Sequence, residues 1–290
     1  VTGATTRLGK IEDGTTGSDH DDEEIRRKLS LYTSVIPVEY KDHKVNVLDT
    51  PGYTDFVGEV VSALRVADGA LILIDSVAGM EVGTEITWGY CDTFKLPRFV
   101  VINKLDRDNA DFQKAFDSVA AFSPVRLVAA QLPWGEKAAF KGVIDLVTMK
   151  AYANEGKAAE EIPAEFKDAA QAARTKLVEA AAEGEDALLE KYLDSGELTD
   201  DELMRGLKAV FLSSTYIPVF VTAGAHEKGI LPLLDAILVD AHLGGPLRGL
   251  RGSGTHGRRA SPRQSASPGD STGSRDVASR LATCTGAVPV

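Results

Sequence analysis

Apolar residues in the first half of the chain alternate between strand-like runs and helix-like spacing. Strands are predicted at 45–48, 70–74 and 99–102, and the last two are unbroken apolar runs, typical of strands covered on both faces. Apolar positions that recur every three or four residues predict helices at 57–67 and 81–94. Because strands that alternate with helices form parallel βαβ units, we expect an α/β fold with a mostly parallel sheet.

The pattern changes after about residue 120. A strand is predicted at 140–147, and the stretch 165–212, rich in Ala, Glu, Lys and Leu, predicts two or three helices. The strand pattern returns at 218–222, and an amphipathic helix is predicted at 229–241. The middle block therefore reads as an insertion between two elements of one sheet.

These patterns divide the chain into the first part of the α/β domain (1–120), an inserted α+β subdomain (121–216), the last strand and helix of the α/β domain (217–243) and a tail (244–290). The tail contains arginines but no lysine. Its arginines are scattered among Gly, Ser, Pro and Ala, without a regular spacing of apolar residues. The tail is either a basic, RNA-binding arm or a frameshifted or misjoined end. On both interpretations its composition predicts that it is disordered.

Charge and cysteine content exclude several classes of protein. A net charge of −11 argues against a protein that binds nucleic-acid phosphates over its whole surface. An RNA partner must therefore bind to a local basic patch or to another domain. The two cysteines have no disulfide or zinc spacing, and we expect Cys91 to be a buried free thiol. No apolar run reaches the roughly 18 residues that a transmembrane helix needs. We expect a cytoplasmic protein with no membrane partner.

The first motif that carries chemistry is Asp49-Thr50-Pro51-Gly52, which directly follows the strand at 45–48. An aspartate at the carboxyl end of a strand in an open α/β sheet lies where ligands bind, and in phosphate-loop NTPases it contributes to the Mg²⁺ shell. Gly52 has no Cβ, so its N–H is able to approach a terminal phosphate. The alternative interpretation is a plain strand-to-turn corner.

The second motif, Asn103-Lys104-Leu105-Asp106, follows the strand at 99–102. The Asp106 carboxylate can accept hydrogen bonds from the N1–H and the exocyclic amine of guanine, a donor pair that adenine lacks. We expect Asn103 to tie neighbouring loops together and the Lys104 stem to cover the base. Alone, this motif could be a surface turn. Two such motifs in this order favour a guanine-nucleotide site in which Asp49 and Asp106 face one cleft.

With these motifs, residues 1–240 resemble the GTP-binding domain of the elongation factor G family of translational GTPases. Further segments that fit the family are Thr2-Gly3, Gly9-Lys10, Asp13-Gly14, 25–30, Val77-Ala78-Gly79, Leu96-Pro97-Arg98, 140–146 and Met149-Lys150-Ala151-Tyr152. The last two lie in the inserted subdomain, which separates this family from elongation factor Tu. The resemblance implies a P-loop NTPase-type G domain that binds GTP or GDP with Mg²⁺.

The resemblance also implies roles for individual residues. Ser30 stands where the family usually carries a threonine whose hydroxyl ligates Mg²⁺, and Asp49 would belong to the same metal site. The implied base-binding residues are Asn103, Lys104 and Asp106, with Ala223 and Gly224 in the last guanine-contacting loop, where Ser-Ala is usual and a backbone N–H would meet the guanine O6. Gly52 and Tyr53 would act at the reacting phosphate.

Two departures from the family pattern matter most, the absent phosphate loop and Tyr53, and Lys28 is a further departure. No G-x-x-x-x-G-K-[ST] phosphate loop is present in the chain, and in the family it lies shortly before the position of Val1. We therefore expect the chain as given to bind GTP weakly or not at all, with an unpaired sheet edge where the first strand is missing. Tyr53 stands where most members carry the histidine that positions the attacking water, and a phenol is a poor base, so we expect slow hydrolysis or a paralogous branch. Lys28 replaces a customary glycine of the first switch.

Three functional hypotheses follow. The first is a monomeric elongation factor G-like enzyme that hydrolyses GTP on the ribosome to drive translocation. The second keeps the fold in a ribosomal protection protein or a release-factor-type GTPase, and the third is a nucleotide-free, truncated interaction module that docks through the insertion. The partners of the enzyme, ribosomal RNA and proteins, come from the resemblance and not from composition.

Other polar residues are interpreted as solvated surface. The histidines in this group, which lack ligand spacing, are His20, His43, His226 and His242. The acidic cluster at 19–24 is interpreted as a solvated loop, with steering of a ribosomal partner as the alternative. The helix predicted at 165–182 is expected to be structural, with an exposed charged face.

Overall fold

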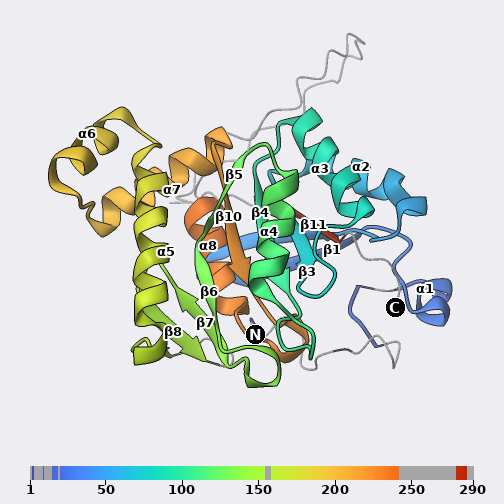
Figure 1. Cartoon of the computed structure of the whole chain (residues 1–290). Coiled ribbons are helices and arrows are strands. Elements are labelled where there is room, and N and C mark those ends of the chain that lie inside the picture. The colour runs from blue at the N-terminus through green and yellow to red at the C-terminus, as the bar shows by residue number, and fades with distance from the viewer. Residues whose placement is uncertain are drawn as a thin grey trace, which may run out of the picture.

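The computed structural model describes residues 2, 9, 15–18, 20–153, 158–241 and 279–285 (Figure 1). Its helices are α1 (Asp22–Arg27), α2 (Val57–Val66), α3 (Val82–Phe94), α4 (Phe112–Phe122), α5 (Ala164–Ala182), α6 (Asp186–Ser195), α7 (Asp200–Ser213) and α8 (Ile230–Ala241). Its strands are β1 (Ser34–Tyr40), β2 (His43–Asp49), β3 (Gly69–Asp75), β4 (Arg98–Asn103), β5 (Arg126–Ala129), β6 (Gln131–Trp134), β7 (Gly142–Asp145), β8 (Lys150–Ala153), β9 (Ala159–Glu160), β10 (Tyr216–Val221) and β11 (Ser279–Thr285).

The main sheet has the strand order β1-β2-β11-β3-β4-β10-β5. All neighbouring strands pair in parallel except β1 and β2, which form an antiparallel hairpin. The strands predicted at 45–48, 70–74 and 99–102 correspond to β2, β3 and β4, and the helices predicted between them correspond to α2 and α3. The predicted α/β fold with a mostly parallel sheet is confirmed.

Helices cover both faces of the main sheet, which explains why its central strands are continuous apolar runs. On one face, Ile72 and Val100 belong to a buried cluster with side chains of α2, α3 and α4, including Trp88. On the other face, Leu71 and Phe99 pack with residues of α8. Figure 1 shows α8 behind the sheet and α4 in front of it.

The insertion has a sheet and a core of its own. Strands β6, β7, β8 and β9 form a separate antiparallel sheet. Helices α5 and α7 pack on it through a buried cluster that includes Ile144, Leu177 and Leu203, while α6 lies at the outer end of the molecule (Figure 1). Three helices fill the stretch for which two or three were predicted, and Gly196 ends α6 in a left-handed conformation.

The start of the insertion differs from the predicted boundary at residue 121. Strand β5 pairs in parallel with β10, with Arg126 opposite Tyr216, so β5 belongs to the main sheet. The separate antiparallel sheet begins only at Gln131. The sequence pattern of 126–134 did not reveal this boundary because two short strands of different sheets follow each other with one residue between them.

The prediction that the tail does not fold is wrong for Ser279–Thr285, which form β11 in the middle of the main sheet. Leu281, Ala282 and Cys284 are buried there. The position between β2 and β3, which we call the seat, is lined by apolar residues on both faces of the sheet. The unpaired sheet edge expected from a missing first strand is therefore absent at this position. The other tail residues, 244–278 and 286–290, lie outside the described residues.

The acidic cluster is also more structured than predicted. Asp21 caps α1 by accepting a hydrogen bond from the Glu23 N–H, and Glu24 completes a capping box. Asp19 lies outside the described residues. The interpretation as a solvated loop is therefore wrong for the residues that build α1.

Cys91 is a buried free thiol, as predicted, and so is Cys284. Burial raises the pKa of Cys91 to about 12 and that of Cys284 to about 11. Within the described part of the chain, no helix combines the length and apolarity needed to cross a membrane.

Candidate functional site

The carboxyl ends of parallel strands line one edge of the main sheet, which we call the carboxyl edge. Along it, β2, β11, β3, β4 and β10 end at Asp49, Thr285, Asp75, Asn103 and Val221. In an open α/β sheet, ligands bind beyond such an edge. The structure therefore brings the two predicted motifs to the same edge, with β11 and β3 between them.

Asn103 joins the loops that follow β4 and β10. Its Oδ1 accepts one hydrogen bond from Thr222 Oγ1 and one from the Gly224 N–H, each at 3.0 Å. The Leu105 N–H donates to the Thr222 carbonyl at 3.4 Å, which adds a backbone link between the same loops. We call these contacts the Asn103 clamp. They are the tie between neighbouring loops that the sequence predicted for Asn103.

The backbone donors of Ala223 and Gly224 are already engaged within the protein. The Ala223 N–H donates to the Lys228 carbonyl at 3.0 Å, and the Gly224 N–H donates to Asn103 in the clamp. In this conformation neither N–H faces outward as the predicted donor to a guanine O6 would. The Ala225 N–H, which the sequence did not single out, has no acceptor among the described residues.

Asp106 contacts a histidine that was expected to be plain solvated surface. Its Oδ2 lies 2.5 Å from His226 Nδ1, with the Asp106 side chain 20% and the His226 side chain 65% exposed. The contact places an imidazole at the carboxylate predicted to bind guanine. The interpretation of His226 as surface alone is therefore incomplete, whereas His242 lies outside the described residues.

Lys104 is held by Asp75, a residue that the sequence analysis missed. Lys104 Nζ lies 2.8 Å from Asp75 Oδ2, and Arg107 reaches the same oxygen at 3.7 Å. Burial alone raises the pKa of Asp75, but the hydrogen bonds from Lys104 and the Val77 N–H, together with the two cations, lower it overall. Asp75 ends β3 as Asp49 ends β2, so the same strand-end rule could have found it.

Asp49 and Thr50 are fixed by β11. Thr283 Oγ1 donates to Asp49 Oδ1 at 3.0 Å, and the Thr283 carbonyl accepts from both the Thr50 N–H at 3.2 Å and Thr50 Oγ1 at 2.8 Å. Thr50 is 4% exposed. The conformation of the first motif therefore depends on a strand that is far away in sequence.

Gly52 and Tyr53 lie immediately beyond this anchored segment. Tyr53 precedes a 3₁₀ turn, Thr54–Phe56, and its carbonyl accepts a hydrogen bond from the Phe56 N–H at 3.0 Å. Both residues are half-buried, and the turn leads into α2. Their position beyond the carboxyl end of β2 agrees with the sequence expectation, while their roles at a phosphate stay predictions.

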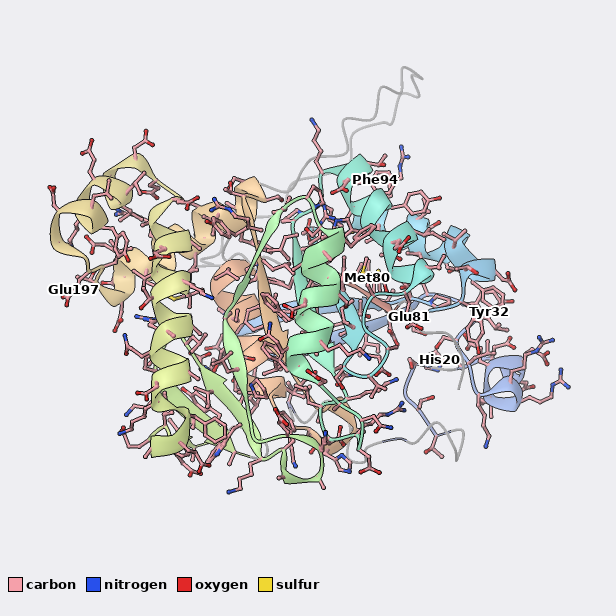
Figure 2. All side chains as sticks on the ribbon, viewed as in Figure 1. His20, Tyr32, Met80, Glu81, Phe94 and Glu197 are labelled. Carbon is pink, nitrogen blue, oxygen red and sulfur yellow. The ribbon has the colours of Figure 1, made fainter. Side chains whose placement is uncertain are left out.

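A buried carboxylate, that of Glu24, organises the loop that carries Ser30. Glu24 is 2% exposed. Its oxygens accept hydrogen bonds of 2.9 to 3.1 Å from the backbone N–H groups of His20, Asp21, Leu31 and Tyr32. Burial alone raises the pKa of Glu24, but these hydrogen bonds lower it overall. In Figure 2, His20 and Tyr32 lie beside α1.

Ser30 lies in this loop, four residues before the start of β1. It directly precedes Leu31, and Ser34 at the start of β1 lies opposite Asp49 in the β1–β2 hairpin. The loop turns at Lys28, which ends α1 in a left-handed conformation with φ of 58°. Glycine adopts this conformation without the steric cost that a Cβ imposes, which gives a physical reason for a glycine at this position.

The side chains of Asp49 and Ser30 carry oxygen donors of the kind that Mg²⁺ prefers. A carboxylate of Asp49 and a hydroxyl of Ser30 are oxygen ligands, and Mg²⁺ is typically held by one or two carboxylates together with substrate phosphates and waters. Among the described residues, no group of three or more His, Cys, Asp and Glu side chains forms a metal site.

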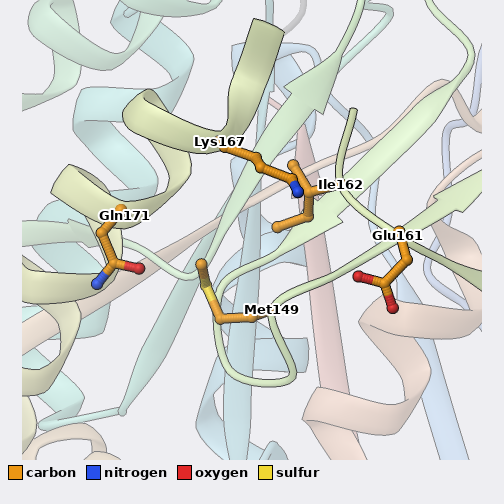
Figure 3. A pocket seen from close by; sticks show the side chains of 5 residues that line it. All are labelled: Met149, Glu161, Ile162, Lys167 and Gln171. Carbon is orange, nitrogen blue, oxygen red and sulfur yellow. The ribbon is translucent and has the colours of Figure 1, made fainter. Parts of the chain in front are cut away.

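A pocket in the insertion is separate from this edge. Figure 3 shows its lining side chains, Met149, Glu161, Ile162, Lys167 and Gln171. None of them belongs to the strand ends or loops described above. The candidate site is therefore defined by the carboxyl edge.

Comparison with known proteins agrees with this geometry. Residues 1–242 match the family described as "Elongation factor Tu GTP binding domain". The chain belongs to this family of GTP-binding domains. Its members are translational GTPases of the group to which the sequence motifs pointed, and the predicted P-loop NTPase-type G domain is thereby confirmed.

The GTP-binding domain is similar to part of much longer proteins. It is 37% identical over 243 residues to elongation factor G of Granulibacter bethesdensis, an alignment that covers 82% of this chain and 35% of that protein. A crystal structure of a protein from Thermus thermophilus superposes with a TM-score of 0.77 at 36% identity, covering 82% of this chain and 36% of that one. The chain thus spans about a third of the length of these relatives.

Substitution of Glu24 tests the loop around Ser30 of this GTP-binding domain. We expect Glu24→Gln to lower the free energy of unfolding by about 1–3 kcal/mol at pH 7, because backbone donors lose a buried charged acceptor. The folded-state pKa of Glu24 is lowered, so its contribution is fully present above the unfolded pKa of about 4.3 and decreases as the pH falls toward the folded-state value. Urea unfolding of both proteins from pH 7 to pH 3.5 measures this.

The neighbouring Glu23→Gln provides the matched control. Glu23 lies on the outside of α1, where it pairs with Arg26 and Arg27, so we expect a smaller loss. Equal losses for the two variants, or a loss for Glu24→Gln that stays constant to pH 3.5, would contradict the role assigned to Glu24.

Proposed function

We propose that this GTP-binding domain belongs to an elongation factor G-like protein that binds GTP with Mg²⁺ and hydrolyses it on the ribosome to drive translocation. The observation that carries the proposal is the Asn103 clamp, which holds the loops after β4 and β10 together beside Asp106. That arrangement supports a guanine-binding function at the same edge as Asp49. A monomeric, cytoplasmic protein whose partners are ribosomal RNA and proteins follows from the same proposal.

Base recognition would centre on Asp106. Its two carboxylate oxygens match the N1–H and the amine of guanine, so the imidazole of His226 would have to move away from Oδ2 when a base binds. Lys104, fixed by Asp75, would lie over the base with its aliphatic stem. Ala225 offers the N–H in this loop that a guanine O6 could use, since those of Ala223 and Gly224 have protein acceptors.

The phosphate side would be formed by the loops around Ser30 and Asp49. We propose that both residues hold Mg²⁺, which would neutralise charge on the phosphates when bound. The Gly52 N–H would face the terminal phosphate, and release of these loops after hydrolysis would couple the reaction to movement of other domains. The chain as given has no phosphate-loop lysine or Ser/Thr, so we expect it to bind nucleotide weakly.

A titration followed by NMR tests base recognition even when binding is weak. We expect millimolar GDP to shift the backbone amide signals of Asn103, Gly224 and Ala225, and ADP at the same concentration to leave them in place, because adenine lacks the donor pair that Asp106 accepts. Asp106→Asn should abolish the difference between the two nucleotides.

The exposed neighbour Asp108 supplies the control, and Asp108→Asn should keep the preference for GDP. Equal responses to GDP and ADP in the wild-type chain, or shifts confined to the insertion, would refute guanine recognition at the carboxyl edge.

A test of the role of Tyr53 needs a version of the chain joined to a phosphate loop, because hydrolysis requires a bound nucleotide. We propose that Tyr53 makes hydrolysis slow, because a phenol positions water less effectively than the family's histidine and is a poor base. Tyr53→His should raise ribosome-stimulated GTP turnover at least about tenfold. Tyr53→Phe, which removes only the hydroxyl, should not raise it, and unchanged turnover in Tyr53→His would reject the slow-hydrolysis proposal.

A further inference from the structure

Strand β11 comes from outside the part of the chain that matches the GTP-binding domain family. The match ends at residue 242, and residues 242–278 separate α8 from Ser279. Nevertheless β11 lies between β2 and β3 and is paired in parallel with both. Its register sets Leu281 beside Val47 and Gly69, and Thr283 beside Asp49 and Leu71.

The seat between β2 and β3 accepts small and medium apolar side chains. Ala282 is 0% and Cys284 is 2% exposed, and both join the cluster formed with α2, α3 and α4. Leu281 points to the opposite face, where it is buried in the cluster that includes residues of α8. An extended segment with a small residue at position 282 therefore packs into the buried clusters on both faces of the sheet.

Polar contacts fix the segment along its length. At the start, the backbone N–H of Arg280 donates to Asp68 at 2.8 Å, and the guanidinium reaches the same carboxylate at 3.1 and 3.2 Å. At the other end, Thr283 binds Asp49 and Thr50. The register is thus specified by an ion pair and by two threonines, in addition to the ladder hydrogen bonds.

We propose that the seat between β2 and β3 is a strand-binding site, in which Ser279–Thr285 dock as a separable peptide. The ligand class is an extended segment that runs parallel to β2 and β3 and carries alternating small apolar residues. A strand in this seat brings position 283 beside Asp49, so its occupant contacts the first motif directly.

This inference does not depend on the proposed GTPase activity, since it concerns how the sheet is completed. Hydrogen exchange on the wild-type chain tests it first. Strand β4 is the matched control, because it also has parallel partners on both sides, β3 and β10. If β11 docks and leaves as a unit, its amides will exchange at least about tenfold faster than those of β4. Equal exchange rates would show that β11 leaves only on global unfolding and would overturn the proposal.

A peptide added to a weakened chain tests the same site in a second way. Ala282→Asp places a charge at a fully buried position and should empty the seat. We expect a fluorescein-labelled peptide of residues 276–290 to bind this variant in the micromolar range by anisotropy and to restore its cooperative unfolding. The same peptide carrying Ala282→Asp should do neither.

Absence of binding by the native peptide at 100 μM to a folded Ala282→Asp chain would overturn the proposal. If the variant does not fold even with peptide present, the comparison of β11 with β4 in the wild-type chain decides. The nucleotide titration described above remains a separate measurement, so failure of one proposal does not imply failure of the other.

Discussion

The pairing of β11 with both β2 and β3 is the interaction on which the geometry of the candidate site depends. In the main sheet, β2 and β3 are not neighbours, and β11 is the strand that pairs with both of them. Asp49 at the end of β2 therefore shares an edge with Asn103 at the end of β4 because β11 bridges the two halves. The bonds from Thr283 to Asp49 and Thr50 extend that dependence from the sheet to the first motif itself.

Buried and half-buried carboxylates position the loops around this edge. Glu24 gathers backbone N–H groups on both sides of α1, and Asp75 holds Lys104 at the second motif. The neutral amide of Asn103 likewise accepts hydrogen bonds that hold the loops after β4 and β10 together. A rigid sheet with polar anchors at its loops is the arrangement by which binding residues on loops are positioned. It supports a nucleotide-binding role for the GTP-binding domain.

Features with a local physical cause could be predicted from sequence. The apolar runs of β3 and β4 and the helical spacing of α2 and α3 follow from periods of about 2 and 3.6 residues. The strand-end positions of Asp49 and Asn103, and the loop tie made by Asn103, followed from motif order. The contact of His226 with Asp106 joins residues 120 positions apart, which only folding brings together. The place of β11 was missed because its composition resembles that of an unfolded tail and its partners lie more than 200 positions away.

The central claim is that Ser279–Thr285 form the strand between β2 and β3. Cross-strand nuclear Overhauser effects measured on the wild-type chain in solution test it most directly. The account predicts effects that connect Ala282 with Leu48 on one side and with Ala70 on the other, as expected for parallel neighbours in this register. Effects that connect β2 directly with β3, with none from 279–285 to either strand, would contradict it.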